Sequence, residues 1–344
     1  MVDIKSLSKQ VLKLLEDKKE DNYRVCIIIV GPPGSGKSTI AEKLTYQLNQ
    51  QYNEYLQHHP DVQVKTRQHD KIDLTSKIKD ISPLLNDKLM KDQGIFKDLV
   101  EDTDFKPVKQ KLADGSFEIM GRGGKPNSFT VSDCNLESNN VDEKNIQVAQ
   151  IIPMDGFHLS RNSLDCFRDP EWAHQRRGSP MTFDSNNFLE LCDVLAQTSL
   201  IRPNESSKGN CFEFLSDTFI ENFPEIKIPG FDHRLKDPTP HCYSINGYTR
   251  IMIFEGLYLL YNQENWQKAY ELLAKTGALL VWNVDIEEGV IQERVGKRHL
   301  QTGIVSTLED GIKRFQKNDL VNARLIKDNL VNDKNIIHIT FLLK

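Results

Sequence analysis

The sequence predicts an α/β fold with a mainly parallel central sheet and helices on both of its faces. Nearly continuous apolar runs, typical of strands covered on both faces, recur at residues 25–30, 148–153, 250–254, 278–284 and 336–342. Stretches with helical spacing of apolar residues stand between such runs, as at 40–48 and 286–300. A glycine-rich loop joins the first strand to the first of these helices. Such alternation is typical of a three-layer α/β/α domain.

The loop after the first strand completes the G-x-x-x-x-G-K-[ST] pattern of a P-loop NTPase. Its residues are Gly31, Pro32, Pro33, Gly34, Ser35, Gly36, Lys37, Ser38 and Thr39. The glycines allow a tight turn that points backbone N–H groups at an anion, and the following helix N-terminus adds to the attraction. Lys37 is expected to reach the β and γ phosphates of a nucleotide, and Ser38 to bind Mg²⁺. A dinucleotide fold is the weaker alternative, since it would use G-x-G-x-x-G without the lysine.

The composition of the chain limits which class of protein it can be. With 344 residues, 38% of them hydrophobic, the chain can bury one large core. Its net charge of -5 disfavours a nucleic-acid partner, which requires a basic face. The six cysteines show no metal-ligand spacing, which favours reduced thiols over a zinc site. No apolar stretch is long enough for a membrane span, and the acidic N-terminal region is unlike a presequence, so we expect an intracellular, cytoplasmic protein.

A long connection divides the expected core. Residues 1–63 hold an amphipathic N-terminal helix and the P-loop part, and residues 148–344 hold the remainder. Residues 64–147 are predicted to be an insertion, because ordinary α/β connections are far shorter. We expect its part at 73–112 to be helical, and residues 117–120 and 128–131 to pair as a hairpin. The insertion is open to three interpretations: a solvated decoration, a lid or a docking surface for a protein partner.

Two carboxylates follow buried strands. Asp155 comes directly after the strand at 148–153, and Glu255 closes the strand at 250–254. Ligands of open parallel sheets gather at the carboxyl ends of the strands, which places both residues near the bound phosphates. Asp155 could then act as a general base, and Glu255 could hold Mg²⁺ directly or through water. The alternatives are an aspartate that caps a turn or helix and a surface glutamate.

Basic residues form a second group of candidates. Arg294, Lys297 and Arg298 share one face of a predicted helix, which could be a lid at about 286–305 that closes over the transferring phosphate. Salt bridges within the helix, such as Glu293 with Lys297, are the alternative.

Several residues are candidates for the substrate side. Arg177 could meet an anionic group or merely solvate a loop, and Asp184 could contact a ligand or cap the helix that follows it. The proline-rich segment at 226–240 contains Asp232, His233 and Arg234, which could touch a substrate or simply form a loop.

With these pieces in place, the chain resembles the phosphoribulokinase, uridine kinase and bacterial pantothenate kinase family of P-loop kinases. Within it, the likeness is to the fructose-transport or pantothenate-kinase-like branch. The motifs that carry the resemblance are the P-loop, residues 154–158, 177–180, 182–184, 229–234, Asp237 with Pro238, residues 254–256, the basic helix, and Asn318, Asp319 and Asn322. Members of the family usually have a short connection where this chain has its insertion.

The resemblance implies roles for individual residues. Lys37 and Ser38 would bind ATP and Mg²⁺, Asp155 would deprotonate the acceptor hydroxyl, and Glu255 would help to hold the metal. Arg294 and Arg298 would stabilise charge on the phosphoryl group. On the substrate side, the matching positions are His158, Arg177, Asp232, His233 and Arg234.

The function predicted is transfer of the γ-phosphoryl group of Mg-ATP to a hydroxyl of a small metabolite, such as a sugar, a nucleoside or a pantothenate-like acid. The alternative is a regulatory ATP-binding module or weak ATPase that docks a protein through the insertion. A GTPase is a poorer third interpretation, because no N-K-x-D tetrapeptide for guanine recognition is present.

Overall fold

The computed structural model describes residues 2–84, 97–133, 136, 145–203, 209–303 and 305–340. The α-helices of this part of the chain are α1 (Ile4–Lys18), α2 (Lys37–His58), α4 (Arg161–Leu164), α5 (Pro170–Gln175), α6 (Ser185–Ser199), α7 (Cys211–Asp217), α8 (Glu264–Lys275), α9 (Glu288–Gln301), α10 (Leu308–Lys317) and α11 (Asp319–Asp328). The strands are β1 (Val25–Val30), β2 (Thr66–Arg67), β3 (Lys79–Asp80), β4 (Val108–Lys111), β5 (Phe117–Met120), β6 (Phe129–Ser132), β7 (Ala149–Pro153), β8 (Phe219–Ile220), β9 (Glu225–Asp232), β10 (Asp237–Ile245), β11 (Ile251–Gly256), β12 (Leu279–Asp285) and β13 (Ile336–Thr340).

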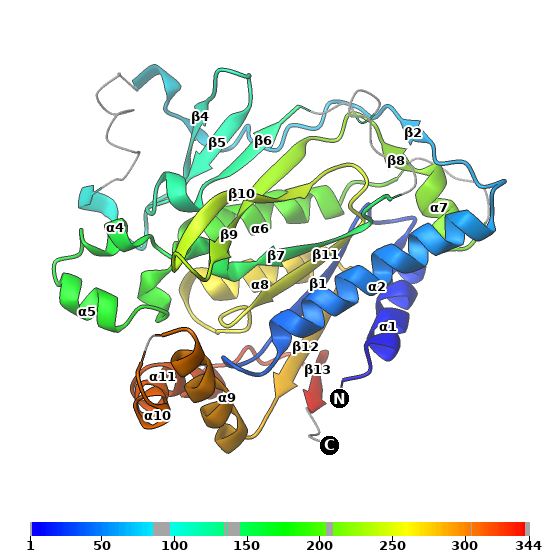
Figure 1. Cartoon of the computed structure of the whole chain (residues 1–344). Coiled ribbons are helices and arrows are strands. Elements are labelled where there is room, and N and C mark those ends of the chain that lie inside the picture. The colour runs from blue at the N-terminus through cyan, green and yellow to red at the C-terminus, as the bar shows by residue number, and fades with distance from the viewer. Residues whose placement is uncertain are drawn as a thin grey trace.

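The central sheet has five strands in the order β13-β12-β1-β11-β7, and all neighbouring pairs are parallel. All six residues of β1 are buried, and they alternate between two apolar cores. Cys26, Ile28 and Val30 face α6 and α8, whereas the other residues of β1 face α1 and α2. Figure 1 shows these helix pairs on opposite faces of the sheet. The three-layer α/β/α prediction with a mainly parallel sheet is therefore confirmed.

A second, six-stranded sheet has the order β10-β9-β6-β5-β4-β3. Strands β3 to β6 come from the predicted insertion, but β9 and β10 come from residues 225–245, and Val131 of β6 pairs with Ile226 of β9. The predicted hairpin is present, since Ile119 pairs with Phe129. Phe129, Val131 and Ile226 are buried in the same core as α6. Apolar residues of β5 and β6 thus pack into the main core, whereas Val108 and Met120 belong to a separate small cluster.

The helical prediction for 73–112 is wrong in the residues of that stretch that the structure describes. They contain two strands, β3 and β4, and two short 3₁₀ turns, Ser82–Leu84 and Lys97–Leu99. Val108 of β4 lies opposite Met120 of β5 and is buried beside it. This pairing across the sheet overrides the local preference for helix on which the prediction rested. Residues 85–96 of the predicted helix lie outside the described residues.

Two fully buried arginines, Arg24 and Arg250, directly precede β1 and β11 at the amino ends of these strands. Arg24 donates from Nε to the Thr249 carbonyl at 2.9 Å and from Nη2 to the Asn246 carbonyl at 2.7 Å. Its guanidinium also lies 4.2 Å from the centre of the Phe223 ring. The guanidinium of Arg250 lies 4.2 Å from the centre of the Tyr23 ring, which stacks on Phe223. Carbonyl acceptors and aromatic faces thus hold the buried charge of Arg24.

We expect Arg24→Ala to lower the free energy of unfolding by about 3 kcal/mol, because it leaves the buried Thr249 carbonyl without this donor and opens a cavity where a fully buried side chain stood. Arg202→Ala is the matched control, since that side chain is 80% exposed and lies 3.7 Å from Asp21. Its effect should stay within about 0.5 kcal/mol. Urea unfolding measures both, and equal midpoints for the two variants would contradict the prediction.

Among the described helices, none has the length and apolar character needed to cross a bilayer.

Candidate active site

The P-loop connects β1 to α2 at the carboxyl edge of the central sheet. Gly34 and Gly36 have φ angles of 80° and 89°, in the left-handed region that favours glycine, and Gly36 is the N-cap of α2. A Cβ on Gly31 would lie 2.7 Å from Ser35 Oγ, which is buried and has no hydrogen-bond partner among the residues described. The loop therefore has the backbone shape that lets N–H groups surround an anion.

Lys37 and Ser38 converge on Glu255. Ser38 Oγ donates a hydrogen bond of 2.8 Å to Glu255 Oε1, and Lys37 Nζ lies 3.5 Å from the same oxygen. Glu255 is 6% exposed. Burial raises the pKa of this carboxyl, the Lys37 ammonium opposes that rise, and the nearby Asp155 charge adds to it. A hydroxyl and a carboxylate side by side are hard oxygen donors, which fit Mg²⁺.

Asp155 lies at the same edge of the sheet. Pro153, at the end of β7, is in register with Glu255 on β11, and Asp155 follows in the 3₁₀ turn Met154–Phe157. The turn packs closely on β9, because a Cβ on Gly156 would collide with the carbonyl of Pro229. The Asp155 carboxylate is half-buried and lies within the electrostatic range of Glu255. The structure thus brings together the two carboxylates that the sequence placed at strand ends.

Helix α9 packs against the P-loop. Arg294 Nη1 donates to the carbonyl of Gly34 at 3.2 Å, and a Cβ on Gly34 would lie 2.8 Å from Val295 Cγ2. Arg298, one turn later, is exposed. Burial raises the pKa of Asp319, and the positive charge of Arg298 is among the effects that oppose this rise. Lys297 forms a salt bridge with Glu293, as the alternative interpretation expected. Arg294 is therefore the member of the predicted basic face that contacts the P-loop.

His158 lies beside Asp155 between two aromatic rings. Its Nδ1 is 2.8 Å from the Asp155 carbonyl, and its ring centre lies 3.9 Å from that of Phe183 and 4.7 Å from that of Phe231. Burial lowers the pKa of His158, and the Asp155 charge opposes this shift. Exposed His233 stacks edge-on against Phe231 at 5.3 Å. An aromatic and imidazole cluster therefore lies next to Asp155.

Acid is expected to destabilise the fold through His158. The native pKa is lowered from 6.5, so at falling pH the unfolded chain takes up a proton that the native state resists. Stability is lost from about pH 6.5 down to the native pKa. In His158→Phe the difference in unfolding free energy between about pH 7.5 and about pH 5 should be smaller than in the parent chain. Urea titrations at both pH values measure this, and an equal difference would argue against it.

Arg177 and Asp232 have structural partners. Arg177 Nη2 lies 2.7 Å from Asp237 Oδ1 and 3.0 Å from the Leu159 carbonyl, and Nη1 donates to the Lys236 carbonyl. Arg177 thus clamps its own loop to the turn between β9 and β10, which contradicts the interpretation that it merely solvates a loop, and contact with an anionic substrate group stays a prediction. Asp232 accepts backbone N–H groups of Arg234 and Leu235 at 2.7 and 3.0 Å, so it shapes that same turn.

Other residues hold the loop of Arg177 from the opposite side. Tyr258 donates to the Gly178 carbonyl at 2.6 Å, and Asn318 and Asn322 donate to the carbonyls of Arg177 and Gly178 at 3.0 and 3.2 Å. The loop therefore joins the β9–β10 turn to the helices that follow α9.

Sequence reasoning missed Arg122. This fully buried residue of the insertion donates to the carbonyls of Val100, Met181 and Phe183. The Gly123 N–H also donates to Asp184, which caps α6 by accepting from the Asn187 N–H at 3.1 Å. The sequence feature that points to this buried contact is an arginine among three glycines, at residues 121–124. The solvated-decoration interpretation is therefore wrong for this part of the insertion.

No family model matches the chain. Curated relatives named ATP-dependent kinase YFH7 are similar to it over almost its whole length. The one from Zygosaccharomyces rouxii is 50% identical over 342 residues, which cover 98% of this chain and 89% of the relative. The one from Saccharomyces cerevisiae is 49% identical over 350 residues, which cover 98% of this chain and 99% of the relative.

Solved structures agree with these relatives. The crystal structure of YFH7 from Saccharomyces cerevisiae, described as a candidate P-loop containing kinase with a circular permutation, aligns with a TM-score of 0.89 at 48% identity. That alignment covers 99% of this chain and 100% of the other. A fructose transport system kinase candidate from Silicibacter sp. TM1040 aligns with a TM-score of 0.53 at 18% identity, covering 99% of this chain and 100% of the other. The second likeness supports the fold alone.

Proposed function

The chain belongs to the YFH7 family of ATP-dependent kinases, and on this premise we propose that it transfers the γ-phosphoryl group of Mg-ATP to a hydroxyl of a small metabolite. The observation that carries the proposal is the position of Asp155 and Glu255 beside the P-loop at one edge of the sheet. A module that only binds ATP needs a phosphate-binding loop but no second carboxylate for an acceptor. We also infer membership of the wider group of phosphoribulokinase, uridine kinase and pantothenate kinase relatives, on the ordered motifs of the sequence.

The nucleotide side is assigned to the P-loop. The backbone N–H groups of 31–39 and the Lys37 ammonium would hold the phosphates of ATP, and Ser38 and Glu255 would hold Mg²⁺. The contact of both side chains with one Glu255 oxygen supports this assignment. When bound, Mg²⁺ neutralises negative charge on the phosphates. Arg294, held at the P-loop by the Gly34 carbonyl, would stabilise charge on the transferring group, and Arg298 would join it as α9 closes.

The acceptor side is assigned to Asp155 and its surroundings. Asp155 would accept the proton of the attacking hydroxyl, because it follows β7 at the edge of the sheet where Glu255 and the P-loop lie, next to His158. His158 and His233 would contact the acceptor. Arg177, Asp232 and the insertion residue Arg122 would hold the surrounding loops in place. Arg234, exposed beside His233, stays a candidate contact at the same turn.

The proposal is tested by measuring ADP release from Mg-ATP in the presence of a panel of nucleosides, sugars and pantothenate-like acids. We expect one compound to stimulate ADP release, and Mg-GTP to support it less well than Mg-ATP. ADP release that no compound changes, at a slow constant rate, would favour a weak ATPase instead.

A further inference from the structure

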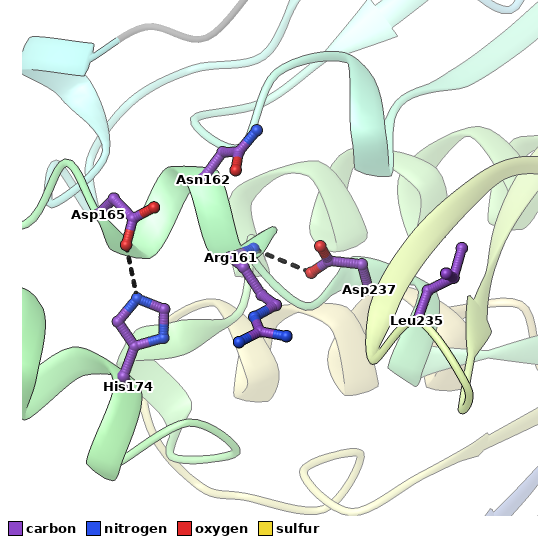
Figure 2. A pocket seen from close by; sticks show the side chains of 6 residues that line it. All are labelled: Arg161, Asn162, Asp165, His174, Leu235 and Asp237. Atoms are coloured by element: carbon purple, nitrogen blue, oxygen red, sulfur yellow. Dashed lines mark hydrogen bonds and ion pairs between the residues drawn. The ribbon is translucent and has the colours of Figure 1, made fainter.

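A pocket of about 710 Å³ lies beside the acceptor side of the site, between α4, α5 and the β9–β10 turn. Figure 2 shows the side chains that line it: Arg161, Asn162, Asp165, His174, Leu235 and Asp237. None of them belongs to the P-loop. The pocket is therefore distinct from the place assigned to the nucleotide phosphates.

Both carboxylates of the pocket already have partners. Asp165 Oδ1 lies 2.7 Å from His174 Nε2. Asp237 Oδ1 accepts from Arg177 Nη2 at 2.7 Å and from the backbone N–H of Arg161 at 2.9 Å. In Figure 2, only this N–H of Arg161, and not its guanidinium, is joined to Asp237. Asp237 is thus paired with Arg177, whereas Asp165 keeps its negative charge unless His174 is protonated.

The Arg161 guanidinium has no hydrogen bond or ion pair with any residue in the described part of the chain. Burial is the main cause of the lowered pKa of Arg177. Asp237 opposes this shift, and the positive charge of Arg161 adds to it. The guanidinium groups of Arg161 and Arg177 therefore repel each other, while Asp237 neutralises only one of the two positive charges. An anion bound to Arg161 would relieve this repulsion and use its N–H donors.

The pocket lies within reach of Asp155. Arg161 follows Asp155 by six positions, so the two α-carbons are at most about 20 Å apart. Arg177 contacts the short segment that joins them, since it bonds to the Leu159 carbonyl and its charge affects the pKa of His158. A small molecule with its hydroxyl at Asp155 could place its other end in this pocket.

We propose that this pocket binds an anionic group, a carboxylate or a phosphate, at the end of the acceptor remote from the reacting hydroxyl. Arg161 offers a planar pair of N–H donors that such groups accept in a bidentate manner. Leu235, which is 66% exposed, offers an apolar contact for the carbon atoms beside the anion. The inference rests on the proposed kinase function, because it names the class of acceptor.

The test measures anion binding to the full chain with the nucleotide site filled by Mg²⁺ and a non-hydrolysable ATP analogue, so that the P-loop is blocked. Inorganic phosphate and butyrate are titrated separately and followed by ligand-observed NMR for the parent chain, Arg161→Gln, Arg161→Lys and Arg168→Gln. Arg168 is the matched control, because its side chain is 95% exposed, lies 3.7 Å from Glu101 and is absent from the pocket lining.

We expect at least one anion to bind about tenfold more weakly to Arg161→Gln than to the parent chain, with Arg161→Lys between them and Arg168→Gln unchanged. Binding of phosphate alone would indicate a phosphorylated acceptor, and binding of butyrate alone a carboxylic acid. Equal affinity of Arg161→Gln and the parent chain for both anions would overturn the inference, as would an equal loss in Arg168→Gln.

The two proposals can fail separately. Arg161-dependent anion binding, with no compound in the ADP-release panel active, would contradict the kinase and leave the anion site in place. A neutral acceptor that is phosphorylated with the same KM by Arg161→Gln would contradict the anion site and leave the kinase in place.

Discussion

Replacing Asp155 with alanine should lower kcat for phosphoryl transfer by about 10²- to 10⁴-fold, the usual contribution of a general base. The affinity for Mg-ATP should change little, because the P-loop, Lys37 and Ser38 remain. Loss of the Asp155 charge also removes one cause of the raised pKa of Glu255, so that carboxyl should ionise more readily in the variant.

The matched control for this variant is Asp70→Ala, since Asp70 is an exposed carboxylate of the insertion. Turnover is measured with the best acceptor of the panel, and nucleotide binding is measured by calorimetry. A kcat within about threefold of the parent chain would remove Asp155 from the role of base.

Lys37→Met should lower kcat by about 10²- to 10³-fold, because it removes a positioned cation from the transferring phosphate. The variant also leaves the buried Glu255 carboxyl without the ammonium that lies 3.5 Å away. The pKa of Glu255 should then rise further, which would weaken its interaction with a metal near neutral pH.

Lys43→Met serves as the control for this second variant. Lys43 lies on the same helix, α2, but its side chain is exposed. Turnover and Mg-ATP affinity should be unchanged in Lys43→Met. Parallel losses in both lysine variants would mean that the effect arises from α2 as a whole and not from the contact of Lys37 with the phosphates.

The sequence predicted the parts of the site that depend on local pattern. The P-loop needs glycine at two positive φ angles, and a buried apolar run directly before Asp155 or Glu255 identifies a strand end. Because neighbouring parallel strands end at one edge, the sequence alone predicts that both carboxylates lie near the phosphate-binding loop. Their individual roles stay predictions that the two variants above address.

Contacts between distant segments could not be predicted in the same way. The partner of Arg177 is Asp237, 60 positions later, and no local spacing links the two. Strand β6 pairs with β9, and Val131 and Ile226 are buried together in one core. A single sequence contains no information on which strands pair, so it does not reveal this contact. In the sequence, length alone distinguishes the insertion from the core, although Arg122 is fully buried and donates to the carbonyls of Met181 and Phe183.

We propose that this site delivers a phosphoryl group to an organic hydroxyl and not to water. The most direct measurement follows the γ-phosphoryl group of labelled Mg-ATP into products, with the stimulating compound present, for the parent chain and for Asp155→Ala. We expect the label in a phosphorylated organic product with the parent chain, and nearly none with the variant. Label that appears only in inorganic phosphate, in equal amounts from both proteins, would contradict the account.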